Sequence, residues 1–219
     1  MYLDDVILRP AINIDCNPND GRTFEFLTED PYLDAQLAVA YVEGVQKQGV
    51  AACVKHYLAN NQETNGGSVD EIIGQRALHE IYMPAFKAVV QQAHVEVVMA
   101  AYNKVNGNYC AANPYLLKDV LEKQWGFNGM IISGWGGVHS IVSTALAGLD
   151  VKMNGDSDYQ HYYFVQLLLN SVKAGKVNED IINNKVKFIV GVMYQLNMPG
   201  NGVRPDGSMN TSKQVYCIM

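Results

Sequence analysis

The 219-residue sequence has little charge of either sign and no excess of basic residues. Lys and Arg total 16 against 22 Asp and Glu, so the net charge is −6, and charged residues make up only 17% of the chain. This balance excludes the basic stripe with which nucleic-acid-binding proteins neutralise phosphates. Because 48% of the residues are hydrophobic, the composition also excludes a disordered chain, whose signature is low hydrophobicity with high charge.

Cysteine and long apolar runs are also scarce. The four cysteines, Cys16, Cys53, Cys110 and Cys217, are scattered without a CxxC pair. This excludes a disulfide scaffold and a thiolate zinc site, and we interpret them as mostly buried thiols. No run of about 18 apolar residues is present, and the first residues lack the pattern of a signal peptide. We therefore expect no membrane contact and assign no compartment.

What the sequence does contain is an alternation of apolar, β-branched runs with amphipathic stretches. We predict five strands, at residues 6–14, 49–54, 95–102, 129–133 and within 146–153. Their continuous apolar character indicates strands that are covered on both faces of a parallel sheet. The fold class is therefore α/β, either an open sheet or a TIM-type (β/α) barrel that is incomplete, with about five of its eight units.

Helix signals separate these strands. Asp30 and Pro31 predict an N-cap and a first helical residue, and Pro84 predicts a kink in a later helix. Asn178 predicts the cap of the last helix. The inward face of the first helix is predicted to consist of Leu33, Leu37, Ala40, Tyr41 and Val45. Residues 1–199 form the predicted barrel domain, and residues 200–219 form a polar linker or tail.

Polar side chains cluster just after the predicted strands, where barrels and open sheets both place their ligand sites. Singly, each has a structural explanation: Lys55-His56 at a strand end is more often structural than functional, and Arg22 can simply pair with Glu25. Together, cationic donors, amides and the indole of Trp135 fit a carbohydrate pocket. The groups are Asp20-Gly21-Arg22 with Glu25, Lys55-His56 with Asn60 to Glu63, Met99 with Tyr102-Asn103, Ser133 to Gly137, and Asp150.

Competing site signatures are incomplete. The glycines at 134, 136 and 137 are followed by His139 where a dinucleotide-binding loop has its third glycine, and no phosphate-binding loop lysine follows. Ser133 lies outside a GxSxG elbow, because Ile131 occupies the first glycine position. The histidines show no metal-ligand spacing, so we expect neither a metal nor an organic cofactor.

Blocks of the sequence resemble glycoside hydrolase family 3. Residues 21–33 are similar to its "GRNFE…EDPYL" segment, and residues 54–63 to its "VKHF…NNQE" block. Residues 98–107 match "VMSAYNKVNG", and residues 125–136 resemble "WGFDG…SDWG". The resemblance extends over residues 6–198 with the blocks in order. The amides Asn60-Asn61-Gln62, in place of a "GHG" loop, are typical of the β-glucosidase branch.

The resemblance implies a (β/α)₈ barrel followed by a second α/β domain, and a retaining hydrolysis of β-linked glucosides by two carboxyl groups. By the same match, Arg22, Lys55 and His56 would hold the sugar hydroxyls, and Tyr102 would orient the nucleophile. The remaining matched positions are the pocket-lining Met99 and Trp135 and the supporting Glu25 and Asn61.

The sequence departs from the family pattern at the catalytic centre. Gly134 stands at the position of the family's nucleophilic Asp, and glycine cannot form a covalent glycosyl intermediate. The acid/base Glu of the family belongs to the second domain, and the barrel's opening segments are also missing. Gly66 replaces an arginine that often follows the "NNQETN" block. Glu25, Glu63 and Asp150 are candidate substitutes, but a misplacement of about 1 Å already costs ~10²-fold in rate.

We therefore expect a truncated β-glucosidase-like barrel domain that acts on a β-glucoside or glucose-type sugar and is inactive or very weak. Gly134 is consistent with an engineered nucleophile exchange or with a natural degenerate copy. The alternative is a non-catalytic sugar-binding or scaffold pseudoenzyme. A third hypothesis is a homo-oligomer in which two incomplete barrels cover each other's open edges.

Overall fold

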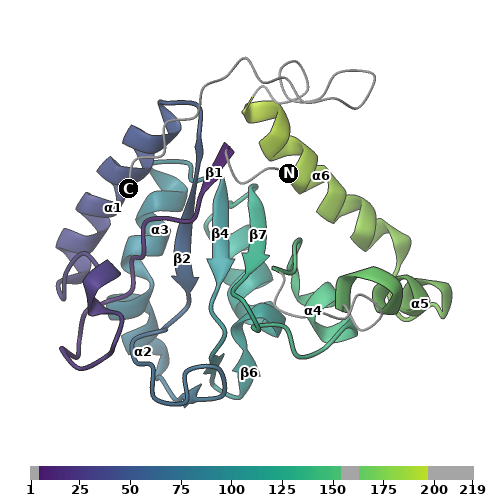
Figure 1. The fold of residues 1–219 in the computed structure, drawn as a ribbon, viewed down its shortest axis with the longest axis horizontal. Coiled ribbons are helices and arrows are strands. Elements are labelled where there is room, and N and C mark those ends of the chain that lie inside the picture. Colours follow the sequence, from purple (N-terminus) through teal and green to yellow (C-terminus); the bar gives the residue numbers. More distant parts are fainter. Residues whose placement is uncertain (1–4, 154–162, 197–219) are drawn as a thin grey trace.

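The computed structural model describes residues 5–153 and 163–196 (Figure 1). Its main sheet has four parallel strands in the order β1 (Val6–Ile7), β2 (Ala51–Tyr57), β4 (Val97–Ala100) and β7 (Met130–Ser133). β1 and β7 each have one strand neighbour in this sheet, so the sheet is open. A second, small sheet contains β3 (Asp70–Glu71), β5 (Lys104–Val105) and β6 (Asn108–Tyr109).

Two of the predicted strands differ from the structure. The first is ordered as β1 for only two residues and then makes a single bridge from Ala11 to Lys55. Pro10, which has no N–H to donate, precedes that bridge. The fifth strand, predicted within 146–153, is wrong as a strand, because α4 (Val142–Ala147) occupies its start and only Val151 bridges to Ile132.

The helix boundaries follow the capping signals. Asp30 Oδ1 accepts hydrogen bonds from the backbone N–H groups of Tyr32 (2.9 Å) and Leu33 (2.8 Å) at the start of α1 (Pro31–Gln46). Asn178 caps α6 (Glu179–Gln195) in the same way.

Pro84 begins α3 (Pro84–Gln91) and interrupts the predicted long helix, whose first part is residues 75–82. The other helical segments are η2 (Thr23–Glu25), α2 (Gln75–Ala77), η3 (Leu78–Tyr82), η4 (Cys110–Ala112), η5 (Tyr115–Gln124), η7 (Tyr163–Leu167) and α5 (Leu168–Lys173).

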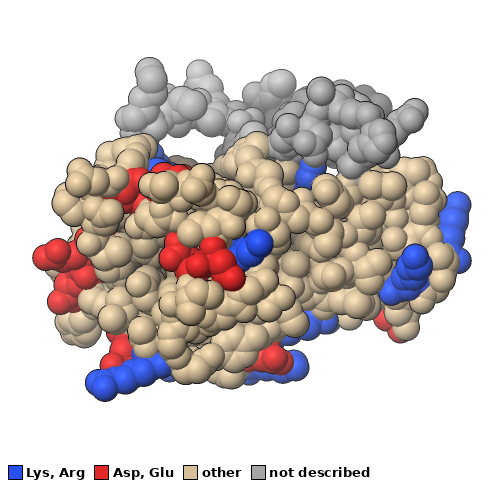
Figure 2. All heavy atoms as spheres, turned by 90° about the horizontal axis from the view of Figure 1, so that it is seen from below, with Lys and Arg blue, Asp and Glu red and all other residues tan. Residues whose placement is uncertain are grey.

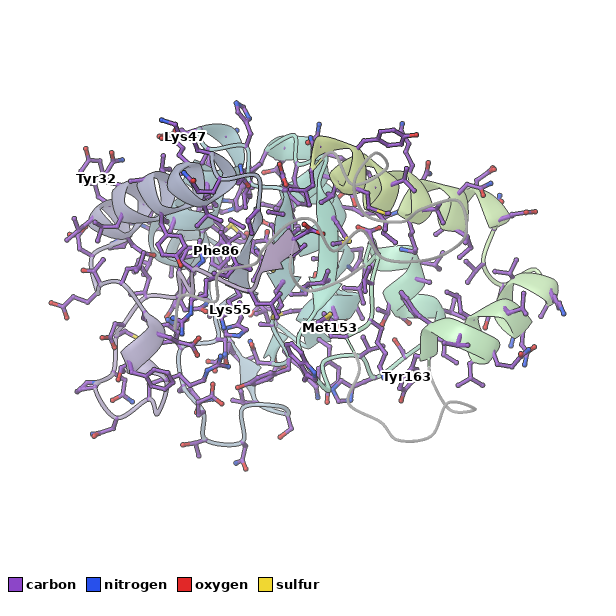
Figure 3. All side chains as sticks on the ribbon, turned by 45° about the horizontal axis from the view of Figure 1, so that its top comes forward. Tyr32, Lys47, Lys55, Phe86, Met153 and Tyr163 are labelled. Carbon is purple, nitrogen blue, oxygen red and sulfur yellow. The ribbon has the colours of Figure 1, made fainter. Side chains whose placement is uncertain are left out.

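The predicted inward face of α1 is wrong. Leu33 and Leu37 are 47% and 43% exposed, and the buried side is made of Asp34, Ala35, Ala38 and Val42. α1 packs against α3, and small alanines permit a close approach of the two helices. Figure 3 accordingly shows Tyr32, at the start of α1, pointing away from the sheet.

Alternate residues of each strand enter two different cores. Ala52, Val54, Val98 and Ile131 belong to the large core beneath α1, α3 and η5. Their neighbours in the strands, including Cys53, Val97, Met99 and Met130, pack on the other face with Val192 and Leu196. α6 therefore covers the second face of the sheet, on the side away from α1 in Figure 1.

Cys53 and Cys110 are buried as predicted, whereas Cys16 is exposed. Cys217 and the predicted tail at 200–219 lie outside the described residues. Within the described ranges, no helix is long and apolar enough to span a membrane.

Candidate functional site

The predicted polar groups gather at the carboxyl edge of the main sheet. The loops that follow β1, β2, β4 and β7 all lie at this edge, below the sheet in Figure 1. Figure 2 views the molecule from this side and shows a mostly uncharged surface, with acidic side chains beside a basic one near its middle. A parallel sheet presents its ligand sites at this edge.

The buried carboxylate of Glu25 binds two of the other predicted residues, Arg22 and Lys55. Arg22 donates to Glu25 Oε1, and Lys55 Nζ lies 3.0 Å from Glu25 Oε2. Burial disfavours the charged form of Glu25, but the hydrogen bonds from Arg22 and Lys55 outweigh it and lower its pKa. Glu25 therefore stays ionised and fixes both cations. Figure 3 shows Lys55 inside the molecule, in contrast to the outward-pointing Lys47.

His56 joins this cluster through Arg22. Its Nε2 lies 3.0 Å from Arg22 Nη2, and since the guanidinium can only donate, Nε2 is the acceptor and the ring proton is on Nδ1. Burial, with the charges of Arg22 and Lys55, lowers the pKa of His56 to about 3. His56 is therefore a neutral imidazole at physiological pH.

Asn13 is a site residue that the sequence analysis missed. Its side-chain amide donates to the carbonyl of His56 (2.9 Å) and accepts from the N–H of His56 (2.8 Å). The sequence placed Asn13 inside an apolar strand, and no motif distinguished it.

Glu63 lies at the centre of a second cluster. Its Oε2 accepts from the Tyr102 hydroxyl, its Oε1 accepts from Asn60 Nδ2 (3.3 Å), and Arg22 Nη1 lies 3.5 Å away. Burial and the neighbouring carboxylate raise the pKa of Tyr102, which keeps the phenol protonated. Gly66 leaves room for this pair, because a Cβ there would lie 2.9 Å from Glu63 Oε2.

Gly134 lies at the end of β7, beside Tyr102. Its N–H donates to the Ala100 carbonyl (2.9 Å), and a Cβ built on it would lie 3.7 Å from Tyr102 Cδ1. The next residue, Trp135, is 51% exposed, so its indole is available to a ligand. Met99 is buried in the core under α6.

Several buried polar atoms at this edge have no hydrogen-bond partner within the described residues. They come from the end of β2 and from the loops after β1, β2 and β4. An unpaired buried polar atom costs roughly 1–3 kcal/mol. Asn61 donates to the carbonyl of Ile14, and its Oδ1 is one of these free atoms. The others at this edge are Asp15 Oδ1, Asp20 Oδ1, His56 Nδ1, Asn60 Oδ1 and Asn103 Oδ1. Their concentration in one place suits a ligand rich in hydroxyl groups.

Asp150 has a different environment from the rest of the predicted residues. Its Oδ2 accepts from the N–H of Ile131 (2.8 Å), and burial raises its pKa. Lys185 of α6 lies nearby and donates to the Leu149 carbonyl (2.5 Å). Among residues 5–153 and 163–196, no three His, Cys, Asp or Glu side chains come together as metal ligands.

Comparison with known proteins identifies the family. Residues 4–192 match the glycosyl hydrolase family 3 N-terminal domain. The chain belongs to glycoside hydrolase family 3. The predicted resemblance is thus confirmed, and with it the α/β fold class and the incomplete TIM-type barrel.

Three relatives show how far the similarity extends. The β-glucosidase BoGH3A of Bacteroides ovatus is 41% identical over 97% of this chain and 29% of its own length. An exo-α-(1→6)-L-arabinopyranosidase of Bifidobacterium longum is 48% identical over 68% of the chain and 20% of its own. The structure of β-glucosidase 3B from Thermotoga neapolitana with α-D-glucose has a TM-score of 0.83 at 42% identity, covering 87% of this chain and 27% of that one. The family 3 chain described here therefore spans less than a third of these relatives.

Proposed function

We propose that this chain carries the glucose-holding part of a retaining β-glucosidase site, which removes terminal β-linked glucose from glucosides and oligosaccharides. We further propose that Gly134 leaves the chain inactive or very weak. The observation that carries the proposal is the cluster of Arg22, Lys55 and His56 around Glu25, on the same edge as Gly134.

Each residue then has a physical role. Arg22 and Lys55 supply fixed donors, and neutral His56 adds a polar ring, which together suit the hydroxyl groups of a sugar. Trp135 offers an apolar face to the ring carbons. We assign to Tyr102 the role of orienting a carboxylate at position 134, because a Cβ there would lie 3.7 Å from its ring. Met99 is 1% exposed in the core under α6, so the pocket-lining role predicted for it requires a ligand to reach beneath this edge. We assign to Glu25 and Asn61 a supporting role: Glu25 fixes Arg22 and Lys55, and Asn61 ties its loop to the Ile14 carbonyl.

The three carboxylates that the sequence offers as substitutes are each already hydrogen-bonded or ion-paired. Glu25 is held by Arg22 and Lys55, and Glu63 by Tyr102 and Asn60. Asp150 accepts a backbone hydrogen bond beneath β7. Each of them is fixed at a position other than residue 134, and a misplacement of about 1 Å already costs ~10²-fold in rate, so we expect none of the three to replace the side chain that Gly134 lacks.

The same observation favours a second candidate function, a non-catalytic sugar-binding or scaffold protein of this family. The donors are retained while the nucleophile position has no side chain, and binding requires only the donors. In both cases the expected partner is a β-glucoside or a glucose-type sugar.

Calorimetric titration with glucose and cellobiose tests the binding. We expect saturable binding that Lys55→Ala abolishes, because it removes one donor and leaves Glu25 half-paired. Lys47→Ala is the matched control, since Lys47 is exposed and lies far from the site in Figure 3. Absence of heat with either sugar would contradict the proposal, as would equal affinity for both variants.

Covalent labelling with a fluorinated suicide glucoside distinguishes a weak hydrolase from a protein that only binds sugar. We expect mass spectrometry to find no covalent sugar on the parent chain, and a label on Glu25, Glu63 or Asp150 would overturn the assignment of inactivity. A parallel titration with an L-arabinopyranoside asks whether the sugar preference follows the Bifidobacterium longum relative instead.

A further inference from the structure

The end of β2 departs from a regular ladder. Val54 pairs with Val98 on β4, and the next pair is Tyr57 with Ala100. Three steps along β2 therefore match two steps along β4, so β2 contains a bulge at Lys55 and His56.

At this register shift, two consecutive side chains point toward the same cluster. In a regular strand, residues 55 and 56 would face opposite sides of the sheet. Here Lys55 contacts Glu25, and His56 contacts Arg22, which is itself bound to Glu25. Neighbouring residues thus converge on one cluster.

The backbone of the bulged segment is bound by the loop after β1 rather than by β4. The Lys55 N–H donates to the Pro10 carbonyl (3.1 Å), and its carbonyl accepts from the Ile12 N–H (2.8 Å). At His56 the side chain of Asn13 replaces a strand, since its amide satisfies both the N–H and the carbonyl of His56. Asn13 is only 2% exposed, so no water competes for these bonds.

We infer that Asn13 is a positioning residue of the sugar site, which holds the bulge of β2 so that Lys55 and His56 both reach the Glu25 cluster. This inference rests on the proposed function. The Asn13 amide donates from Nδ2 and accepts at Oδ1, so Asn13→Asp loses the donor and Asn13→Ala loses both bonds.

The first readout needs no sugar. The pKa of His56 is measured by NMR titration of the imidazole ring protons, assigned with the His56→Gln variant. In the parent we expect the ring to remain neutral down to about pH 4, because burial and the charges of Arg22 and Lys55 lower the pKa of His56 to about 3. In Asn13→Ala we expect His56 to gain access to water and its pKa to move toward the usual 6.5, with Asn13→Asp altered in the same direction.

The second readout is sugar affinity. We expect Asn13→Ala to bind glucose about tenfold more weakly than the parent, as expected for loss of hydrogen bonds that orient charged donors. Asn113→Ala is the control, because Asn113 is also buried but donates to the Val105 carbonyl and accepts from the N–H of Leu116 in η5. We expect Asn113→Ala to lower the free energy of unfolding without changing the pKa of His56 or the affinity for glucose.

The two readouts keep this inference distinct from the proposed function. If the parent binds no sugar, the proposed function fails, and the His56 titration still decides whether Asn13 holds the bulge. A folded Asn13→Ala or Asn13→Asp variant with unchanged His56 titration overturns the inference. If Asn13→Ala does not fold, Asn13→Asp decides the outcome.

Discussion

At position 134 the backbone leaves room for a side chain. A Cβ there would meet the Ala100 carbonyl oxygen at 3.4 Å and Tyr102 Cδ1 at 3.7 Å, which are ordinary van der Waals contacts. Gly129, which directly precedes β7, leaves no such room. A Cβ there would lie 2.2 Å from the Glu96 carbonyl oxygen. A side chain at position 129 should therefore destabilise the fold more than a side chain at position 134.

We expect Gly134→Asp to fold with a free energy of unfolding within about 1 kcal/mol of the parent, since it also reduces the entropy of the unfolded chain. Gly129→Ala should cost more than about 2 kcal/mol, because either β7 or Glu96 must move. Urea denaturation of both variants measures this. We expect no hydrolysis of an aryl β-glucoside by Gly134→Asp, and strong turnover would reveal an acid catalyst within this chain.

At the residue scale, the sequence predicted candidate site members but not the contacts that the structure gives them. Arg22, Lys55, His56 and Glu25 were predicted because they lie in motifs that follow strands. The role of Asn13 was not predictable, because it depends on a bulge in a strand 43 residues away. The pairing of Tyr102 with Glu63 likewise depends on the space above Gly66, which the sequence does not show.

At the scale of an element, α1 carries a buried acid without a partner. Asp34 is fully buried, and neither of its carboxylate oxygens has a hydrogen-bond partner within the described residues. Burial raises the pKa of Asp34 from 3.8 to about 7. Because the folded state holds this proton more tightly than the unfolded chain, its contribution weakens the fold progressively as the pH rises from about 4 to 7.

We expect Asp34→Ala to raise the free energy of unfolding at pH 8 by on the order of 2–4 kcal/mol, with a much smaller gain at pH 4. Chemical denaturation at both pH values measures the difference. Glu43→Ala, on the exposed side of α1, is the matched control and should change stability by less than about 0.5 kcal/mol. Equal gains for Asp34→Ala at the two pH values would contradict the assignment.

Element ends were predictable from local chemistry, whereas element faces were not. Asp30, Pro84 and Asn178 interact with the backbone within one helical turn, so the local sequence is sufficient to predict where these helices begin. The orientation of α1 is decided by its packing against α3, which favours alanines over leucines at the contact. The stretch 146–153 was apolar enough to predict a strand, but its first residues complete α4 and Gly148, at φ +116°, ends that helix.

At the scale of the whole molecule, the sheet is open and its two faces are covered unequally. The helices α1, α3 and η5 cover one face, while α6 packs on the other through few residues, chiefly Val192 and Leu196. β1 has β2 as its strand neighbour on one side, and Ile7 on this edge strand is 38% exposed. An edge strand with one strand neighbour among the described residues is a template for pairing with a second chain.

We therefore expect self-association at micromolar concentration, with β1 as the pairing edge, measured by sedimentation velocity. Ile7→Lys should shift the distribution toward monomer, because a charged side chain on an edge strand opposes pairing. Ile72→Lys is the matched control: Ile72 is 78% exposed but lies outside the main sheet, so its replacement should leave the distribution unchanged. A parent chain that sediments as a single monomer would contradict the expectation. Association that persists in Ile7→Lys would show that β1 is not the pairing edge, and the exposed leucines of α1 would then be the next surface to test.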